Sequence, residues 1–208
     1  MIKIEAPKLL RKIEEKHVND FVNEEKIIEG KFLEEKLSDK IKGTEINGCV
    51  FKNVDFSGGM LEDADLIDCV FDSCDLSNVS ISAKLFLRVS FINCSLVGLN
   101  VLDSSVKDVS FKNCNLKYAN FSSKFKNVSF DTCNLESSRF FENTFSSVMI
   151  TSCDLSKAEI FKTSLDGMDL SSCKLRDVAA DLVSVKGVSV DMTGAINLST
   201  VLGINIKF

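Results

Sequence analysis

The sequence is short of the residues that most catalytic sites need. Its 208 residues include no Trp, one Tyr, one Pro and a single histidine, His17. One histidine near the N-terminus cannot serve a Ser-His-Asp or Cys-His arrangement in the rest of the chain. Gly58 and Gly59 are not followed by the Lys-Ser or Lys-Thr of a phosphate-binding loop. We therefore expect no enzyme activity, no catalytic residues, no metal and no cofactor.

Long apolar runs and a signal peptide are missing as well. No segment approaches the about 20 apolar residues of a membrane-spanning helix. The first residues, MIKIEAPKLLRKIEEK, contain no apolar stretch followed by a small-residue cleavage site. The net charge of −5 is mildly acidic and does not favour a general nucleic-acid binder. These features predict a cytoplasmic protein that contacts no membrane and binds no nucleic acid directly.

What the sequence does contain is a repeat. Large apolar residues recur every five positions, as at Ile46, Phe51, Phe56 and Leu61, and a mostly small residue precedes each by two. Neither a helix nor a plain strand has a period of five, whereas a coil that turns a corner every five residues and closes a square every twenty does. Stacked at about 4.8 Å, about eight such coils form an all-β solenoid. Seven blocks, 20 residues apart except for one interval of 19, carry the longer period: CVFKNVDF, CVFDSCDL, VSFINCSL, VSFKNCNL, VSFDTCNL, VMITSCDL and MDLSSCKL.

All eight cysteines occupy the small inward position of this repeat. Stacked neighbours about 4.8 Å apart would suggest disulfides, but parallel stacked Cβ atoms point the same way and thiols in the cytosol stay reduced. A zinc site needs convergent ligands and usually His. We therefore interpret the cysteines as small core residues. The predicted structural core comprises Phe51, Phe71, Phe91, Phe111, Phe130, Cys74, Cys94, Cys114, Cys133, Cys153 and Cys173.

Both ends of the repeat predict short helical caps. Residues 1–26 place Leu9, Ile13 and Val18 at helical spacing, with Leu10, His17 and Phe21 in the same pattern, and would cover one open end. Residues 27–190 form the repeat domain. In residues 191–208, Asp191 is a candidate N-cap, Gly203 a helix stop, and residues 204–208 a terminal strand. This apolar end predicts a homodimer, with the candidate interface Leu198, Val201, Leu202, Ile204, Ile206 and Phe208.

Two further features leave alternatives open. The pattern slips by one residue between Phe121 and Phe125, which indicates either a corner with one outward residue missing or a recognition corner. Charge is also unevenly distributed along the sequence. Residues 53–76 contain acidic residues but no Lys or Arg, whereas in residues 81–130 Lys and Arg outnumber Asp and Glu. The acidic residues are either a partner-binding patch or a solvated face: Asp55, Glu62, Asp63, Asp65, Asp68, Asp72 and Asp75. The basic residues are Lys84, Arg88, Lys107, Lys112, Lys117, Lys124 and Lys126.

The motifs CDLSN, VDFSG, ADLID and CNLKY resemble the pentapeptide-repeat family over at least residues 44–190. That resemblance implies a right-handed quadrilateral β-helix. The tail GVSVDMTGAINLSTVLGINIKF is similar to the C-terminus of the quinolone-resistance (Qnr-type) branch, in which a helix and an LGI-type strand mediate dimerisation. This carries over to Leu202, Gly203 and Ile204, with Val201 and Ile206 beside them. The branch implies a DNA-mimicking dimer that binds a type II topoisomerase, DNA gyrase or topoisomerase IV, and protects it from quinolones.

Two departures from that branch keep other functions open. The chain has no loop insertion in the repeat, and a stretch of lysines interrupts any row of carboxylates that would stand in for phosphates. Three hypotheses therefore remain: a topoisomerase-binding protein, an interaction scaffold with another protein partner, and a structural β-helix without a dedicated partner.

Overall fold

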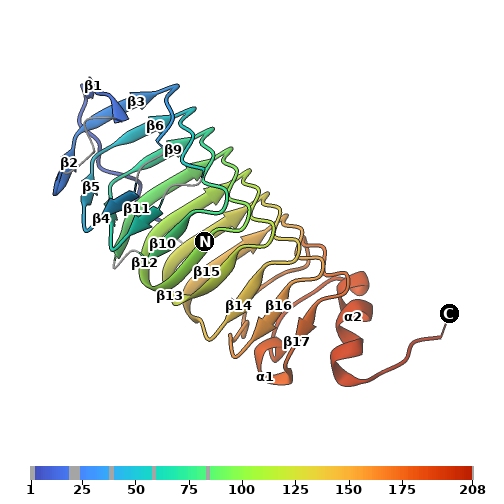
Figure 1. Ribbon diagram of the computed structural model, residues 1–208. Helices are drawn as coiled ribbons and strands as arrows, with labels where there is room; N and C mark the ends of the chain where they lie inside the picture. The colour runs from blue at the N-terminus through green and yellow to red at the C-terminus, as the bar shows by residue number, and fades with distance from the viewer. Residues whose placement is uncertain (1–2, 19–23, 38–39, 58–59, 83–84, 208) are drawn as a thin grey trace.

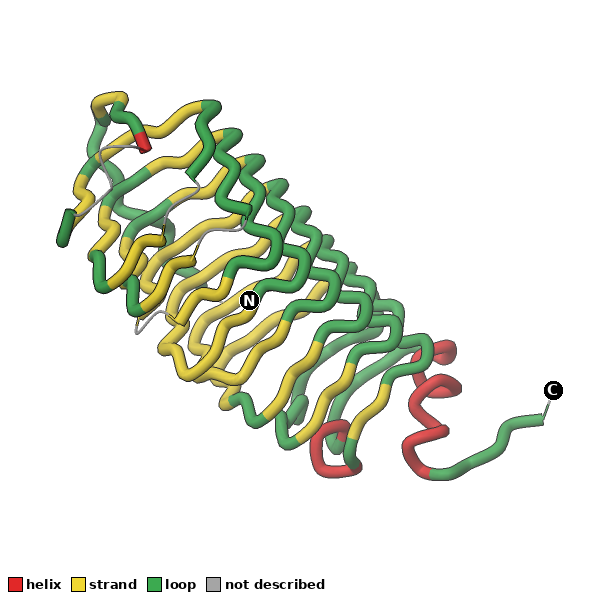
Figure 2. Tube along the Cα trace, in the orientation of Figure 1, coloured by secondary structure: helices red, strands yellow, loops and turns green. Residues whose placement is uncertain are grey.

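The chain winds into a β-solenoid of about eight coils in the computed structural model, which describes residues 3–18, 24–37, 40–57, 60–82 and 85–207 (Figures 1 and 2). The coils stack into a straight rod, and two short helices lie at its C-terminal end. Each coil has four sides, which we number by their inward residues. The first face contains Ile46, the second Phe51, the third Phe56 and the fourth Ile81.

Parallel strands cover three of the four faces. The first face has β2 (Lys26–Ile28), β5 (Glu45–Asn47) and β8 (Asp65–Ile67), and the second has β3 (Gly30–Leu33), β6 (Val50–Lys52) and β9 (Val70–Asp72). The fourth has β4 (Lys40–Lys42), β7 (Met60–Glu62), β10 (Ser80–Ser82), β14 (Arg139–Phe141), β16 (Glu159–Phe161) and β17 (Ala179–Ala180). Longer strands turn a corner within the strand: β11 (Leu85–Ile92), β12 (Asn100–Lys112), β13 (Asn120–Asp131) and β15 (Thr144–Thr151).

The register places each residue on its equivalent one coil later. Phe51 pairs with Phe71 and Phe91 with Phe111, twenty residues on in each case. The third face has no named strand among the described residues, and its coils are joined by single bridges such as Asp55 to Asp75. Like residues therefore stack on like, as the period of twenty predicts.

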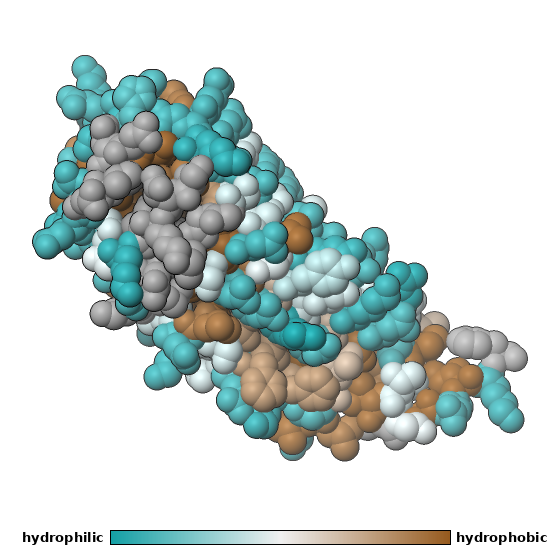
Figure 3. All heavy atoms as spheres, in the orientation of Figure 1, coloured by the Kyte–Doolittle hydropathy of each residue, from teal (hydrophilic) through white to brown (hydrophobic). Residues whose placement is uncertain are grey.

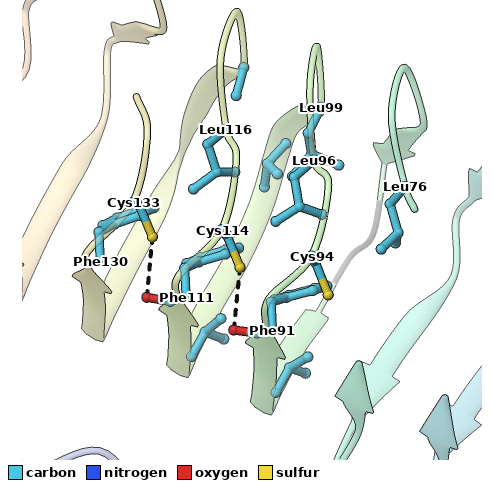
Figure 4. Close-up of a cluster of buried hydrophobic side chains, with 14 of the residues drawn as sticks. Leu76, Phe91, Cys94, Leu96, Leu99, Phe111, Cys114, Leu116, Phe130 and Cys133 are labelled. Atoms are coloured by element: carbon cyan, nitrogen blue, oxygen red, sulfur yellow. Dashed lines mark hydrogen bonds between the residues drawn. The ribbon is translucent and has the colours of Figure 1, made fainter. Parts of the chain in front are cut away.

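The interior is a solid apolar core. The second face buries a ladder of phenylalanine rings, in which Phe111 stacks on Phe91 at 5.0 Å and on Phe130 at 4.8 Å between ring centroids. All eleven residues of the predicted core are buried. The cysteine column lies beside this ladder as free thiols, and Figure 4 shows the Sγ atoms of Cys114 and Cys133 directed at the carbonyl oxygens of Phe91 and Phe111. The thiols thus fill space and donate to the preceding coil.

Left-handed backbone marks the corners. Twenty-two described non-glycine residues have φ between 51° and 60°, and most lie two positions after an inward residue. Asn and Asp tolerate this conformation best, but Thr132 and Arg88 also adopt it. The tight corner, rather than the local residue preference, determines the backbone there.

The slip between Phe121 and Phe125 is absorbed at one corner. The register between β12 and β13 shifts between Leu102 and Ser105 and resumes with Ser105 opposite Lys124. At the shift, the Ser104 backbone N–H donates to Ser123 Oγ at 3.0 Å, in place of a backbone acceptor. This geometry matches a corner with one outward residue missing.

The predicted N-terminal helix is wrong for residues 3–17. These residues form no helix, Val18 has 3-10 helical backbone, and β1 (Glu14–Glu15) pairs in parallel with β3, opposite Gly30 and Lys31. Phe21 lies outside the described residues. A short helix in water is marginal, whereas an extended segment satisfies the unpaired edge of the first coil with backbone hydrogen bonds. The cap is therefore a strand.

The C-terminal helix agrees with its prediction. The Asp191 side chain accepts from the Gly194 N–H at 2.7 Å and caps α2 (Met192–Ser199), and the chain turns at Gly203 with φ 70°. A shorter helix, α1 (Leu182–Val185), precedes it. The predicted terminal strand is not formed, since residues 204–207 pair with no described strand, and Phe208 lies outside the described residues. A strand needs an edge to pair with, and the tail projects beyond the last coil (Figure 1).

Candidate functional site

The acidic residues of positions 53–76 do not share one surface. Asp55 and Asp75 stack on the third face, Asp65 lies on the first face opposite Glu45, and Asp72 lies on the second. Asp63 and Asp68 occupy corners, and the side chain of Glu62 lies outside the described part. Because five residues make one side, a run of carboxylates along the sequence encircles the rod rather than lining it.

Several of these carboxylates already have structural partners. Asp55 Oδ1 accepts from the Ser57 N–H at 2.8 Å, and Oδ2 lies 3.0 Å from Lys36 Nζ. Hydrogen bonds from Ser57 and Lys36 hold the pKa of Asp55 below its ordinary value. The same side-chain turn recurs along the third face at Asp75 and Asp154. On this face the Asp residues close the turn of each coil.

Asp68 has the strongest partners of the acidic group. Arg88 binds it with two hydrogen bonds, 2.6 Å from Nε and 2.7 Å from Nη2, and the Lys8 N–H donates to it at 2.7 Å. Burial acts to raise the pKa of Asp68, but the bonds from Arg88 and Lys8 outweigh it and leave the pKa below its ordinary value. This carboxylate is therefore part of the structure and unavailable as a phosphate mimic.

The contact with Lys8 belongs to an N-terminal arm, residues 3–13, that the sequence did not reveal. Its Glu5 N–H also reaches Asp108 Oδ1 at 3.4 Å, 103 residues away. The arm therefore runs along the corner between the first and second faces, and the N-terminus lies near the middle of the rod (Figure 1). The sequence gives no signal for these two contacts, because each occurs once and joins residues that are far apart in the chain.

A buried polar column is a second feature that the sequence analysis missed. Ser104, Ser123, Asn143, Thr163 and Ser184 occupy the small inward position of the first face and are buried. Each side chain from Ser123 onward accepts from the backbone N–H of the preceding member, at 2.9–3.1 Å. The regular spacing of these polar residues at 19 to 21 positions was the available signal. Their side-chain oxygens accept hydrogen bonds from buried backbone N–H groups at this corner, which would otherwise have no partner.

Ion pairs one coil apart neutralise most cations of the third and fourth faces. Lys117 and Lys157 both contact Glu136, at 2.9 and 3.3 Å, and lower its pKa. Arg139 pairs with Glu159 at 3.0 Å on the fourth face. These faces present alternating charges, and neither has a continuous row of unpaired carboxylates among the described residues.

On the first face, three lysines lie close together without ion pairs in the described part of the chain. Lys107 pairs in register with Lys126 on the adjacent strand, and Lys124 precedes Lys126 by two residues on the same side of β13. All three are exposed and have no ion pair within the described chain. Lys112 lies around the corner on the second face, and Lys84 lies outside the described residues.

Apolar surface gathers at the C-terminal end. Val183 of α1 is 75% exposed, and Leu182, Ile204 and Ile206 are also exposed. A groove beside them is lined by Leu182, Val185, Lys186, Ala195, Leu198, Ser199 and Ile204, and brown side chains cluster here in Figure 3. Of the predicted interface, Leu198, Val201, Ile204 and Ile206 lie at this end, while the side chain of Leu202 is outside the described part.

The described residues contain no group of three or more His, Cys, Asp and Glu placed to hold a metal ion. Burial raises the pKa of the Cys69 thiol and of the Cys173 thiol, which disfavours thiolate chemistry at these two positions. No helix within the described ranges is both long and apolar enough to cross a membrane. The features that remain as candidates are outer surfaces.

Several known proteins are similar to this chain. The chain is similar to HetL, a pentapeptide repeat protein of the cyanobacterium Nostoc sp. strain PCC 7120, with 16% identity, coverage of 88% of this chain and 86% of that one, and a TM-score of 0.46. It is also similar to QnrB1, a plasmid-mediated fluoroquinolone resistance protein, with 26% identity, coverage of 93% and 95%, and a TM-score of 0.35. No curated protein sequence matches significantly. The family model "pentapeptide repeat region" matches residues 44–121 and 84–160, more than half of the chain and all within the coils. This chain belongs to the pentapeptide repeat family.

Proposed function

We propose that this chain is a dimeric, non-enzymatic binding protein whose partner is a type II topoisomerase, DNA gyrase or topoisomerase IV. The observation that carries the proposal is the C-terminal segment. The helix α2, capped by Asp191, is followed by a 3-10 turn that ends at Gly203, and Ile204 then lines an apolar groove. The same segment is similar in sequence to the dimerisation segment of the quinolone-resistance branch.

Dimerisation would bury the apolar end of the rod. Val183 is 75% exposed and Ile204 50%, and both lie at the C-terminal end of the chain. We expect the parent protein to sediment as a dimer and the double variant Ile204→Asp/Ile206→Asp as a monomer. Lys207→Asp is the matched control, because it changes charge in the same tail without removing apolar surface. A monomeric parent, or an unchanged dimer in the double variant, contradicts the proposed interface.

Topoisomerase binding is tested directly with purified enzyme. The parent protein should reduce quinolone-stabilised DNA cleavage by gyrase, or alter supercoiling, at micromolar concentration. The monomeric variant should be weaker in the same assay, since only the dimer is proposed to bind. No effect of the parent in either assay, with gyrase and with topoisomerase IV, refutes this partner.

The distribution of carboxylates on the rod does not suit a mechanism in which the protein mimics DNA. A DNA mimic needs carboxylates in rows that replace phosphates, yet Asp55 pairs with Lys36 and Asp68 with Arg88. The acidic residues also lie on different faces. We therefore propose binding that depends on the dimer and its end, with the residue 55–75 carboxylates in a structural role.

An interaction scaffold for a different protein partner is the second candidate. The observation in its favour is the cluster of three exposed lysines, Lys107, Lys124 and Lys126, in two adjacent coils of the first face. A flat solenoid face is well suited to bind another chain. A partner other than a topoisomerase, retained by the parent protein and lost when these lysines are replaced, would favour this function.

A further inference from the structure

The first face of the rod carries three exposed lysines in two adjacent coils, which we name the lysine triad: Lys107, Lys124 and Lys126. Lys107 lies opposite Lys126 on neighbouring strands, a separation of about 4.8 Å between backbones. Lys124 and Lys126 point to the same side of β13, about 6.6 Å apart along the strand. Ser105 and Thr144 flank Lys124 in register, and the hollow beside Lys124 is also lined by Asp103 and by Glu142, which pairs with Lys162 at 2.7 Å.

The triad differs from the other cations of the coils that follow residue 113. Between residues 113 and 180 there are eight Lys and Arg residues. Six of them make ion pairs: Lys117, Arg139, Lys157, Lys162, Lys174 and Arg176. The two without a partner in the described chain are Lys124 and Lys126, which lie next to the equally unpaired Lys107.

The nearest carboxylate in sequence does not compensate the triad. Asp108 is buried, and its Oδ1 accepts from Asn127 Nδ2 at 3.0 Å and from the Glu5 N–H at 3.4 Å. Like charges directly opposite each other on adjacent strands are destabilising. The fold therefore gains nothing from this cluster, whereas a bound anion would remove the repulsion.

We propose that the lysine triad is a docking site for an acidic, extended segment of a partner protein. Side chains at alternate positions of an extended chain are also about 6.6 Å apart, so carboxylates two residues apart match Lys124 and Lys126. Lys107 then contacts the neighbouring carboxylate along the rod axis. The segment lies parallel to β13 and crosses the rod.

Duplex DNA fits this surface less well. A duplex lying along the first face would meet Glu45 and Asp65, which stack on the same face in earlier coils. A segment that crosses the rod avoids them. Three lysines also neutralise too few phosphates for tight binding, because nucleic-acid affinity grows with the number of phosphate contacts. The proposal is independent of the topoisomerase assays above.

The test uses the whole 208-residue chain and a fluorescent peptide of alternating Glu and Ser. We expect saturable binding by fluorescence anisotropy at low ionic strength, weakened about tenfold or more in Lys107→Gln/Lys124→Gln/Lys126→Gln, as expected from the loss of three exposed charge contacts. The matched control replaces three lysines of the second face, Lys31, Lys52 and Lys112, by Gln and should retain binding. Replacement of the triad by Arg should also retain binding.

Folding and specificity are checked in the same series. The triad variant should melt no lower than the parent protein, because it removes only repulsion. Equal peptide binding by the parent and the triad variant overturns the proposal, as does equal weakening by the control. Duplex DNA that binds the parent more tightly than the peptide, through the same three lysines, overturns the choice of an acidic polypeptide.

Discussion

The phenylalanine ladder allows a quantitative test of the inward register through Phe111→Ala. Phe111 is 2% exposed and lies between Phe91 and Phe130, with interplanar angles of 4° and 3°. Its removal opens a gap at mid-rod, with coils on both sides. Neither neighbour can fill that gap without breaking its own stack.

The expected loss follows from the area and the stacking. A buried Phe hides about 200 Å², and at about 25 cal/mol per Å² this is worth about 5 kcal/mol. The Ala methyl group retains part of it, and the cavity and the lost ring contacts add to the cost. We therefore expect Phe111→Ala to lower the free energy of unfolding by about 3–5 kcal/mol.

Urea unfolding followed by circular dichroism measures this loss. Phe141→Ala is the matched control, because Phe141 is 47% exposed on the fourth face and should cost less than about 1 kcal/mol. The m-value matters as well, since a gap in a solenoid can uncouple the coils on either side and split the transition. A change below about 1 kcal/mol for Phe111→Ala, in a single transition with an unchanged m-value, would refute the register.

Three further predictions concern the corners and the buried polar groups. Ser147 has φ 57°, so Ser147→Gly should raise the free energy of unfolding by up to about 1 kcal/mol in urea unfolding, whereas Ser146→Gly, one residue earlier in the same strand and without a positive φ, should lower it by a similar amount. Asn143→Leu should cost about 2–3 kcal/mol in urea unfolding, because it leaves two backbone groups of the polar column unpaired, while Asn143→Ser should cost less. Asp68→Asn should cost about 2 kcal/mol at neutral pH. The pKa of Asp68 is lowered in the folded state. The contribution of Asp68 to the free energy of unfolding is therefore complete above the unfolded pKa of about 3.9 and is lost as the pH falls from there towards the folded-state pKa. A difference in the free energy of unfolding between parent and variant that stays constant down to pH 2 would contradict this.

The sequence predicted the coil architecture because the same contact is repeated many times. Each inward position, such as Phe71 or Phe91, faces an identical environment one coil away, so the pattern is visible without any long-range information. The C-terminal cap was predictable for a different reason. Asp191 and Gly203 act on backbone groups within a few residues of themselves.

The N-terminal arm, which the sequence did not predict, depends on single contacts between distant residues. The arm is held where Lys8 reaches Asp68, and that pairing occurs once and has no period. The apolar spacing of Leu9 and Ile13 suggested a helix, but the edge of β3 offered backbone hydrogen bonds that a helix could not use. Local propensity is a weak guide where an open strand edge competes with it.

In a solenoid, residues that are close in sequence lie on different faces, and residues of successive coils lie side by side on one face. Neighbouring carboxylates at Asp65, Asp68 and Asp72 fall on different sides of one coil, so their density along the chain creates no patch. Lys107 and Lys126 are far apart in sequence, yet they are adjacent on the rod. The one-residue slip lies before Lys124, so Lys107 and Lys126 stack in the same register that a coil of twenty residues would give them. Insertion of one residue after Ser122 should restore the period of twenty at that corner and leave this stacking intact, because the coil absorbs the change before Lys124. Binding of the acidic peptide should therefore survive the insertion, and its loss would show that the shortened corner is itself part of the docking surface.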